Sequence, residues 1–130
     1  MIESVASAFG FINQYEQIQH LYKNNIQNLV ILGCPCSDFG GQEVRDAKSL
    51  HKFWILNYGV SFPLTEKIEI KLITRLLYLW LTGVSLNGEG NVDIKQKFSK
   101  FLIDEVVPLI KCKSSASKPI CNEITDWIKN

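Results

Sequence analysis

The stretch Val30-Ile-Leu-Gly-Cys-Pro-Cys-Ser-Asp-Phe-Gly-Gly-Gln-Glu43 holds the clearest signal of fold in this chain. It overlaps the apolar run Asn28–Gly33, which is short, continuous and rich in branched residues. Such a run is expected of a strand that is buried on both faces of a sheet. From Cys34 to Gly41, a proline and two adjacent glycines indicate a loop. The stretch therefore predicts one buried strand followed by a loop.

Helical patterns lie on both sides of this strand. Apolar residues recur at helical spacing over Asn13–Tyr22, with Asn13 as a candidate cap, and over Glu43–Asn57. Thr74–Leu81 predicts a short and very apolar helix, and the glycines of Thr82–Val92 predict a loop. A last helix is expected to begin near Pro119. Its predicted inner face consists of Ile120, Ile124, Trp127 and Ile128.

Further strands are expected between these helices. Phe98–Ile103 and Val106–Ile110 predict an antiparallel pair around Asp104-Glu105, and a strand is also expected at Ile68–Ile70. Before the first helix there is only a stub, Ile2–Ala6 at most. Because helix and strand signals alternate, the chain is predicted to be an α/β protein with right-handed crossovers between its parallel strands.

Length and composition restrict the function as well as the fold. The chain has 130 residues, which predicts one domain over 1–130, and 46% hydrophobic residues, which are enough for a packed core. A net charge of +1 gives no basic surface for nucleic acid, and no apolar run approaches the roughly 18 residues needed to span a membrane. The segment Met1–Ser4 has no secretory signal pattern, so a cytoplasmic location and reduced cysteines are expected.

Three segments carry a resemblance to a known family. The first segment resembles N-V-A-S-K-C-G-x-T-x-Q-Y and consists of Val5-Ala-Ser-Ala-Phe-Gly10 with Asn13-Gln-Tyr15. The second segment, Val30–Glu43, resembles V-I-L-G-F-P-C-N-Q-F-G-G-Q-E. Leu56-Asn-Tyr-Gly-Val-Ser-Phe-Pro-Leu64 is similar to L-N-Y-G-V-T-F-P-L, and a weaker match covers Phe98–Asp104. These are motifs of the glutathione peroxidase family. The resemblance implies a thioredoxin-like fold, in which helices flank a central mixed sheet. Here that fold is expected to lack the family's N-terminal hairpin and most of its first, central strand.

The resemblance also implies a chemistry, the reduction of hydroperoxides by thiols in the oxidative stress response. A cysteine or selenocysteine of low pKa attacks the peroxide, and glutathione or a thioredoxin-served second cysteine then restores it. The attacking position is occupied here by Phe9, whereas the family's site glutamine is retained as Gln42. The family's tryptophan and asparagine fall at Gln96 and Lys97, and the resolving cysteine of thioredoxin-dependent members falls at Trp54. The sequence therefore predicts a peroxidase-like protein whose activity is lost or much reduced.

Other interpretations of these residues remain open. Cys36 is a candidate substitute thiol, and a packed structural thiol is the alternative for the same residue. Cys34-Pro35-Cys36 also leaves open a strained disulfide or a metal site, although zinc usually has four ligands. No cofactor is expected beyond the thiol reductant. One alternative is a non-enzymatic interaction protein, in which an exposed sheet edge pairs with a partner or with a second copy of the chain. Another alternative is a gene remnant without a function.

Overall fold

The computed structural model describes residues 1–5, 13–36, 46–65, 76–88, 99–105, 111–114 and 116–129. Within these ranges a four-stranded sheet has the order β2-β1-β3-β4. The strands are β1 (Ile2–Val5), β2 (Leu32–Pro35), β3 (Lys100–Leu102) and β4 (Lys111–Lys113). β1 is parallel to β2 and antiparallel to β3, which is antiparallel to β4. The sheet is therefore mixed, as predicted.

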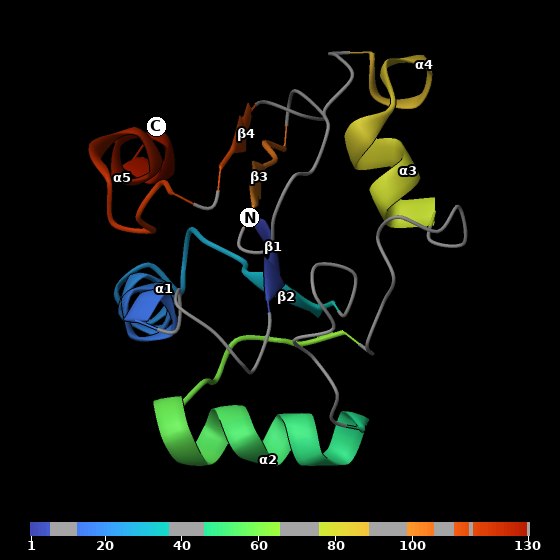
Figure 1. Cartoon of the computed structure of the whole chain (residues 1–130). Helices are drawn as coiled ribbons and strands as arrows, with labels where there is room; N and C mark the ends of the chain where they lie inside the picture. The colour runs from blue at the N-terminus through green and yellow to red at the C-terminus, as the bar shows by residue number, and fades with distance from the viewer. Residues whose placement is uncertain are drawn as a thin grey trace.

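Helices lie on both sides of the sheet (Figure 1). α1 and α5 lie on one side, α3 and α4 lie on the other, and α2 crosses below the end of β2. Their bounds are α1 (Asn13–Asn24), α2 (Ala47–Tyr58), α3 (Leu76–Thr82), α4 (Val84–Asn87) and α5 (Asn122–Lys129). This arrangement is the thioredoxin-like α/β fold that the sequence predicted.

The short first strand occupies the centre of the sheet. β1 has 4 residues and pairs on both sides, with Ile2 opposite Leu32 of β2 and Phe101 of β3. Because strand residues alternate between faces, Ile2 and Ser4 point to the α3 side of the sheet. Glu3 and Val5 point to the α1 side. The predicted stub is therefore a real central strand, only a short one.

The strand expected at Asn28–Gly33 lies further along the chain, and two parts of that prediction were wrong. Pairing starts where the Leu32 amide donates to the carbonyl of Met1, at 3.0 Å. The residues before Leu32 have no place in the ladder, and Val30 is exposed, so the run is not buried on both faces. Cys34 and Pro35, which were expected in a loop, belong to β2.

The second predicted helix starts later than its apolar pattern suggested. Asp46 has an extended backbone, and its side chain accepts the Ser49 amide at 2.9 Å. This is the geometry of an N-cap, so the helix begins at Ala47 rather than at Glu43. It ends at Gly59, whose φ of 59° is the left-handed conformation that favours glycine at a helix C-terminus.

Several other boundaries also differ from the sequence-based predictions. The loop predicted over Thr82–Val92 contains α4, and the partner of β3 is found at Lys111–Lys113. The predicted strands Ile68–Ile70 and Val106–Ile110 lie outside the described residues. On the predicted inner face of the last helix, Ile124 is buried and Trp127 and Ile128 are partly buried, whereas Ile120 precedes α5 and is exposed.

The two faces of the sheet support separate apolar clusters. On the α1 side, Tyr15 and Ile18 of α1 pack with Trp54 of α2 and Ile124 of α5. On the α3 side, Tyr78 and Leu81 of α3 pack with Phe101, Cys34 and Cys36. Within the described residues, no helix is long and apolar enough to cross a membrane. Cys34 of β2 and Cys36, which directly follows β2, thus lie in the α3-side cluster.

Candidate functional site

The parallel strands β1 and β2 end at the same edge of the sheet. Val5 is the register partner of Pro35, and the Cys36 amide donates to the Val5 carbonyl at 3.0 Å. In open α/β sheets, ligands bind beyond the carboxyl ends of the parallel strands. Phe9 follows β1 and Gln42 follows β2 in the sequence, so this edge is the candidate site. Phe9, Gln42, Gln96 and Lys97 themselves lie outside the described residues.

Cys34 and Cys36 are the chemically reactive residues that the structure describes at this edge. They are two positions apart on an extended chain, so both side chains point to the α3 side of the sheet. Both have 0% exposure and both are thiols. The ring of Tyr78 packs beside them and meets Phe101 edge to face, with 6.0 Å between the ring centroids. This setting is dry and mainly apolar.

The environment of Cys34 opposes formation of a thiolate. Burial raises the pKa of the Cys34 thiol, and the nearby hydroxyl groups of Thr65 and Tyr78 offset this increase only in part. Burial and the neighbouring Cys34 in turn raise the pKa of Tyr78 well above its usual value. The Tyr78 hydroxyl lies close to that thiol without hydrogen-bond geometry to any residue the structure describes. A neutral thiol beside a neutral phenol is a poor nucleophile for a peroxide.

Cys34 and Cys36 are poorly placed for the two alternatives left open by the sequence. Alternate residues of an extended strand have Cα atoms about 6.6 Å apart, which is close to the upper limit for a disulfide. Among the residues that the structure describes, no three His, Cys, Asp or Glu side chains gather as a metal site. Cys121 is partly buried on the α1 side of the sheet, in the other cluster. Cys112 lies in β4 opposite Phe101.

Trp54 is part of the core on the α1 side. It is buried, and its ring centroid lies 5.8 Å from that of Tyr15. Tyr15 also stacks on Tyr58, at 5.1 Å. The residue at the position where the resemblance predicted a resolving cysteine is thus a packed indole. The face of α2 that contains Trp54 therefore belongs to the apolar core.

The sequence-based search missed a buried charged cluster on the α1 side. Glu3 and Lys100 are register partners in β1 and β3, with 3.2 Å between Lys100 Nζ and Glu3 Oε1. Lys100 also donates to Gln14 Oε1 of α1, at 2.7 Å. Burial raises the pKa of Glu3 to about 7, although Lys100 acts in the opposite direction. A lysine inside the apolar segment Phe98–Ile103 was the available signal.

The comparisons with known proteins agree with this fold. The glutathione peroxidase family model matches residues 1–81. The chain is 40% identical over 122 residues to a glutathione peroxidase homolog, BsaA, of Staphylococcus aureus strain MW2, covering 92% of this chain and 77% of the relative. It is 37% identical over 121 residues to the glutathione peroxidase-like peroxiredoxin 2 of Saccharomyces cerevisiae, covering 92% and 75%.

A solved structure gives the same result. The crystal structure of Trgpx in its apo form superposes with a TM-score of 0.68 and 28% identity, covering 99% of this chain and 79% of that one. The match includes the short central strand and the helices on both sides of the sheet. This chain belongs to the glutathione peroxidase family.

Proposed function

We propose that this chain is a glutathione-peroxidase-family protein in which reduction of hydroperoxides by thiols is lost or strongly reduced. The observation that carries the proposal is Phe9, which occupies the position of the attacking thiol in the motif Val5–Gly10. A benzyl side chain has no nucleophile and no ionisable group, so it cannot perform the first step. A single domain over 1–130 and a cytoplasmic location are part of the same proposal.

The chemistry that Phe9 lacks is a two-stage exchange. A thiolate sulfur attacks one peroxide oxygen, the O–O bond breaks, and the departing alkoxide takes a proton to become an alcohol. The sulfur is then a sulfenic acid. Two reducing thiols return it to the thiol, form a disulfide between themselves and release water. Glutathione, or a thioredoxin, is the reductant class that this cycle requires.

The buried thiols of Cys34 and Cys36 support the proposal. Cys34 and Cys36 are the nearest described substitutes at the candidate edge, and neither is accessible to solvent. The raised pKa of Cys34 further reduces its thiolate fraction at neutral pH. A substitute nucleophile would have to become exposed before it could meet a peroxide.

The test is hydroperoxide consumption by the purified chain, with glutathione and separately with a thioredoxin system. We expect no turnover by the wild type and measurable turnover by Phe9→Cys. The matched control is Phe9→Ser, which also removes the aromatic ring but supplies no thiol, and which we expect to be inactive. Wild-type turnover at the rate of an ordinary thiol peroxidase, abolished by alkylation, would overturn the proposal.

A residual peroxidase that uses Cys36 is the second candidate. It is favoured by the position of Cys36, whose amide is bonded to Val5 at the carboxyl edge of the parallel strands. In that case Cys36→Ser removes the wild-type activity and Cys34→Ser retains it. Gln42, the retained family position, would stabilise the attacking sulfur, so Gln42→Ala would slow the same reaction.

A further inference from the structure

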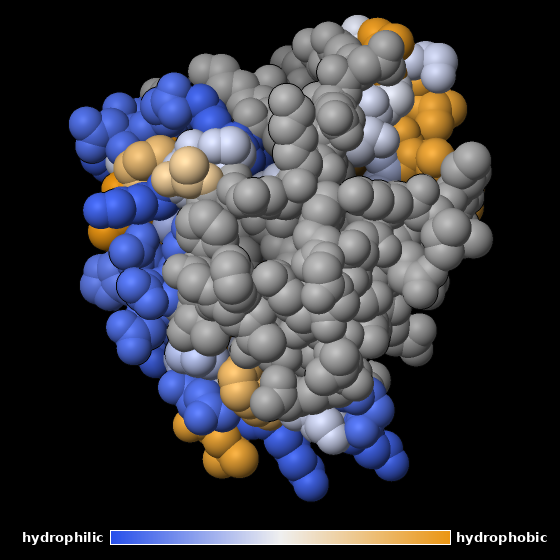
Figure 2. Space-filling model, viewed as in Figure 1, coloured by the Kyte–Doolittle hydropathy of each residue, from blue (hydrophilic) through white to orange (hydrophobic). Residues whose placement is uncertain are grey.

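One turn of α3 lies over the thiols of Cys34 and Cys36. Tyr78 and Leu81 are the buried residues of α3, and they are three positions apart, so both lie on the same face of the helix. They pack with Cys34 and Cys36 in the cluster on the α3 side of the sheet, where both thiols have 0% exposure. The opposite face of α3 is exposed at Leu76, and Figure 2 shows apolar surface where Figure 1 places this helix. α3 thus lies between the two thiols and the solvent on this side of the sheet.

α3 has little stability of its own. It has 7 residues, whereas an isolated helix needs about 12–15 residues to be even marginally stable in water. It has no acidic residue in its first turn and no basic residue in its last turn that would interact favourably with the helix dipole. The position of α3 therefore depends on the packing of its inner face on the sheet.

Two hydroxyl groups near this contact oppose the packing. The Tyr78 hydroxyl is buried without hydrogen-bond geometry to any residue that the structure describes, and the same is true of the Ser4 hydroxyl. Ser4 is the register partner of Cys34 and points to the α3 side of the sheet. A hydroxyl group that loses water and gains no hydrogen bond costs free energy. Water that enters when α3 moves away restores these hydrogen bonds, so both groups favour an open position.

The other face of the sheet has its own core. Tyr15 and Ile18 of α1, Trp54 of α2 and Ile124 of α5 pack in the cluster on the α1 side, which shares no residue with the cluster under α3. Proteins open locally in cooperative units that cost less free energy than unfolding of the whole domain. The separation of the two clusters allows α3 to leave the sheet while the α1 side stays folded.

We propose that α3 is a gate over Cys34 and Cys36, which opens locally and exposes both thiols while the α1 side of the fold stays intact. In the closed position the thiols are dry, and burial raises the pKa of Cys34. Opening removes this desolvation, so the thiols become available to small dissolved electrophiles, the class that includes hydroperoxides. The gate goes beyond the proposed function because it needs no turnover. It is also the step that a peroxidase reaction at Cys36 would require.

The experiment is alkylation of the native full chain by iodoacetamide at pH 8, with mass spectrometry of each cysteine over a series of low urea concentrations. When closing is fast, the labelling rate is proportional to the open fraction. A local opening exposes little surface, so the labelling rates of Cys34 and Cys36 should depend only weakly on urea. Unfolding of the whole chain, followed by circular dichroism, depends steeply on urea, and the difference in slope separates the two processes.

A pair of matched variants locates the gate. Leu81→Ala weakens the closed position and should speed the labelling of Cys34 and Cys36 at low urea at least about tenfold. The control is Ile124→Ala, which shortens an equally buried aliphatic side chain in the cluster on the α1 side. It should lower the urea midpoint of global unfolding and leave the labelling rates at low urea unchanged.

Tyr78→Phe tests the buried hydroxyl. It keeps the ring that packs edge to face on Phe101 and removes a hydroxyl that is dry in the closed position and hydrated in the open one. Labelling of both thiols should therefore be slower than in the wild type, by roughly threefold or more. A faster rate in Leu81→Ala and a slower rate in Tyr78→Phe cannot both come from a general loosening of the fold. Thermal melts followed by circular dichroism check that all three variants fold.

Three results would overturn the proposal. The first is labelling of Cys34 and Cys36 with the same urea slope as global unfolding, and the second is a Leu81→Ala variant that labels no faster than the wild type. The third is an Ile124→Ala variant that speeds labelling at low urea as much as Leu81→Ala, because the opening would then involve the whole fold. Faster labelling in Tyr78→Phe would also count against the gate, since the hydroxyl would then stabilise the closed position. None of these results depends on peroxidase turnover, so the gate and the proposed function fail separately.

Discussion

Lys100 and Glu3 form a buried ion pair in the middle of the sheet, with 3.2 Å between Nζ and Oε1 and almost no exposure of either side chain. The same ammonium donates to Gln14 of α1, at 2.7 Å. One lysine thus ties together the central strand, its antiparallel neighbour and the first helix.

Removal of the ammonium should strongly destabilise the fold. In Lys100→Met the side chain keeps its length but the buried Glu3 carboxylate loses its ion-pair partner, so we expect a loss of about 3–5 kcal/mol. Urea unfolding at pH 8, where Glu3 is ionised, measures the loss. The matched control is Lys113→Met, in the register-paired position of β4.

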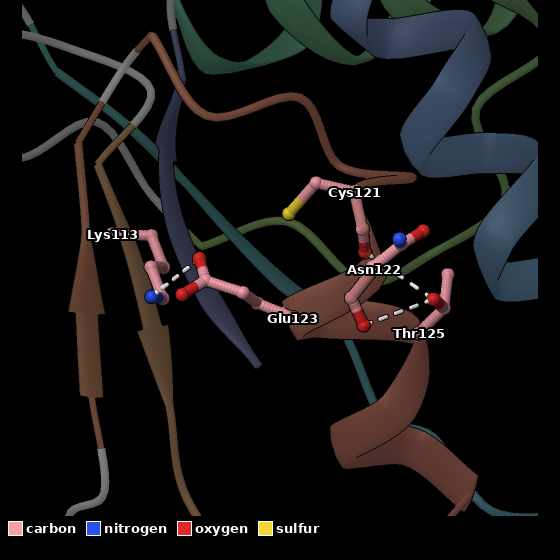
Figure 3. Close-up of polar contacts among 5 residues, drawn as sticks. All are labelled: Lys113, Cys121, Asn122, Glu123 and Thr125. Carbon is pink, nitrogen blue, oxygen red and sulfur yellow. Dashed lines mark hydrogen bonds and ion pairs between the residues drawn. The ribbon is translucent and has the colours of Figure 1, made fainter.

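The control is suitable because Lys113 also forms an ion pair, but near the surface. Figure 3 shows Lys113 of β4 reaching Glu123 of α5, at 2.6 Å, and the Glu123 side chain is mostly exposed. Surface pairs contribute about 0–1 kcal/mol, so Lys113→Met should cost much less than Lys100→Met. Equal losses would mean that the buried pair contributes no more than a surface pair.

Between about pH 4.5 and 6 the stability of the fold should fall with rising pH because of Glu3; above this range the Met1 ammonium, whose pKa burial lowers to about 6, acts in the opposite direction. Burial raises its folded-state pKa to about 7 from a reference value of 4.5, so the folded state retains the proton longer than the unfolded state. The contribution is fully present below about 4.5 and is lost as the pH rises through about 7, by a total on the order of 3 kcal/mol. Urea midpoints at several pH values measure this slope. Glu3→Gln should flatten it, whereas Glu123→Gln at the surface should not.

The strand thiols should react slowly with an alkylating reagent. Cys34 and Cys36 are fully buried and burial raises the pKa of Cys34, so labelling in the native state should lag behind that of the partly exposed Cys121. Mass spectrometry of iodoacetamide-treated protein at pH 6 and pH 8 measures each site. Labelling in urea is the control, in which Cys34, Cys36 and Cys121 should react at similar rates. Fast native labelling of Cys36 at pH 6 would favour the residual-peroxidase candidate.

A methyl group at Gly33 should disturb the packing beside β2. A Cβ there would lie 2.6 Å from Leu64 Cδ2 and 3.0 Å from Phe62 Cε2. We expect Gly33→Ala to cost about 1–3 kcal/mol, because overpacking forces neighbours to shift. In a double-mutant cycle with Leu64→Ala, the combined loss should be less than additive, since the smaller side chain makes room. Strict additivity would show that Leu64 is not the obstacle.

The helices were predicted well where their own residues decide them. α1 begins at Asn13 as predicted and extends to Asn24, because its buried residues follow helical spacing. Apolar spacing cannot show which residue caps a helix, so the start of α2 was placed at Glu43. The Asp46 side chain caps the N-terminus of α2 by accepting the Ser49 amide, so the helix begins at Ala47. Local hydrogen bonding of this kind is invisible in a hydrophobic pattern.

Strand positions were predicted less well, because pairing decides them. The apolar run Asn28–Gly33 looked like a strand, yet the ladder starts at Leu32, where Met1 and β1 supply partners. At the candidate site, Phe9, Gln42 and Cys36 could be named from the sequence alone. A packed Cys36 was one of the interpretations drawn from the sequence, and the burial of this thiol depends on α3 lying over β2.

By itself the sequence determined the family, the longer helices and the absence of a thiol at position 9, since each depends on residue identity and short-range spacing. Only the tertiary structure decided which groups are buried together. Lys100 and Gln14 are 86 positions apart in the chain, and the ammonium is stable in the core only because strand pairing brings Glu3 beside it. Charge burial depends on partners that are distant in sequence, and the fold alone supplies them.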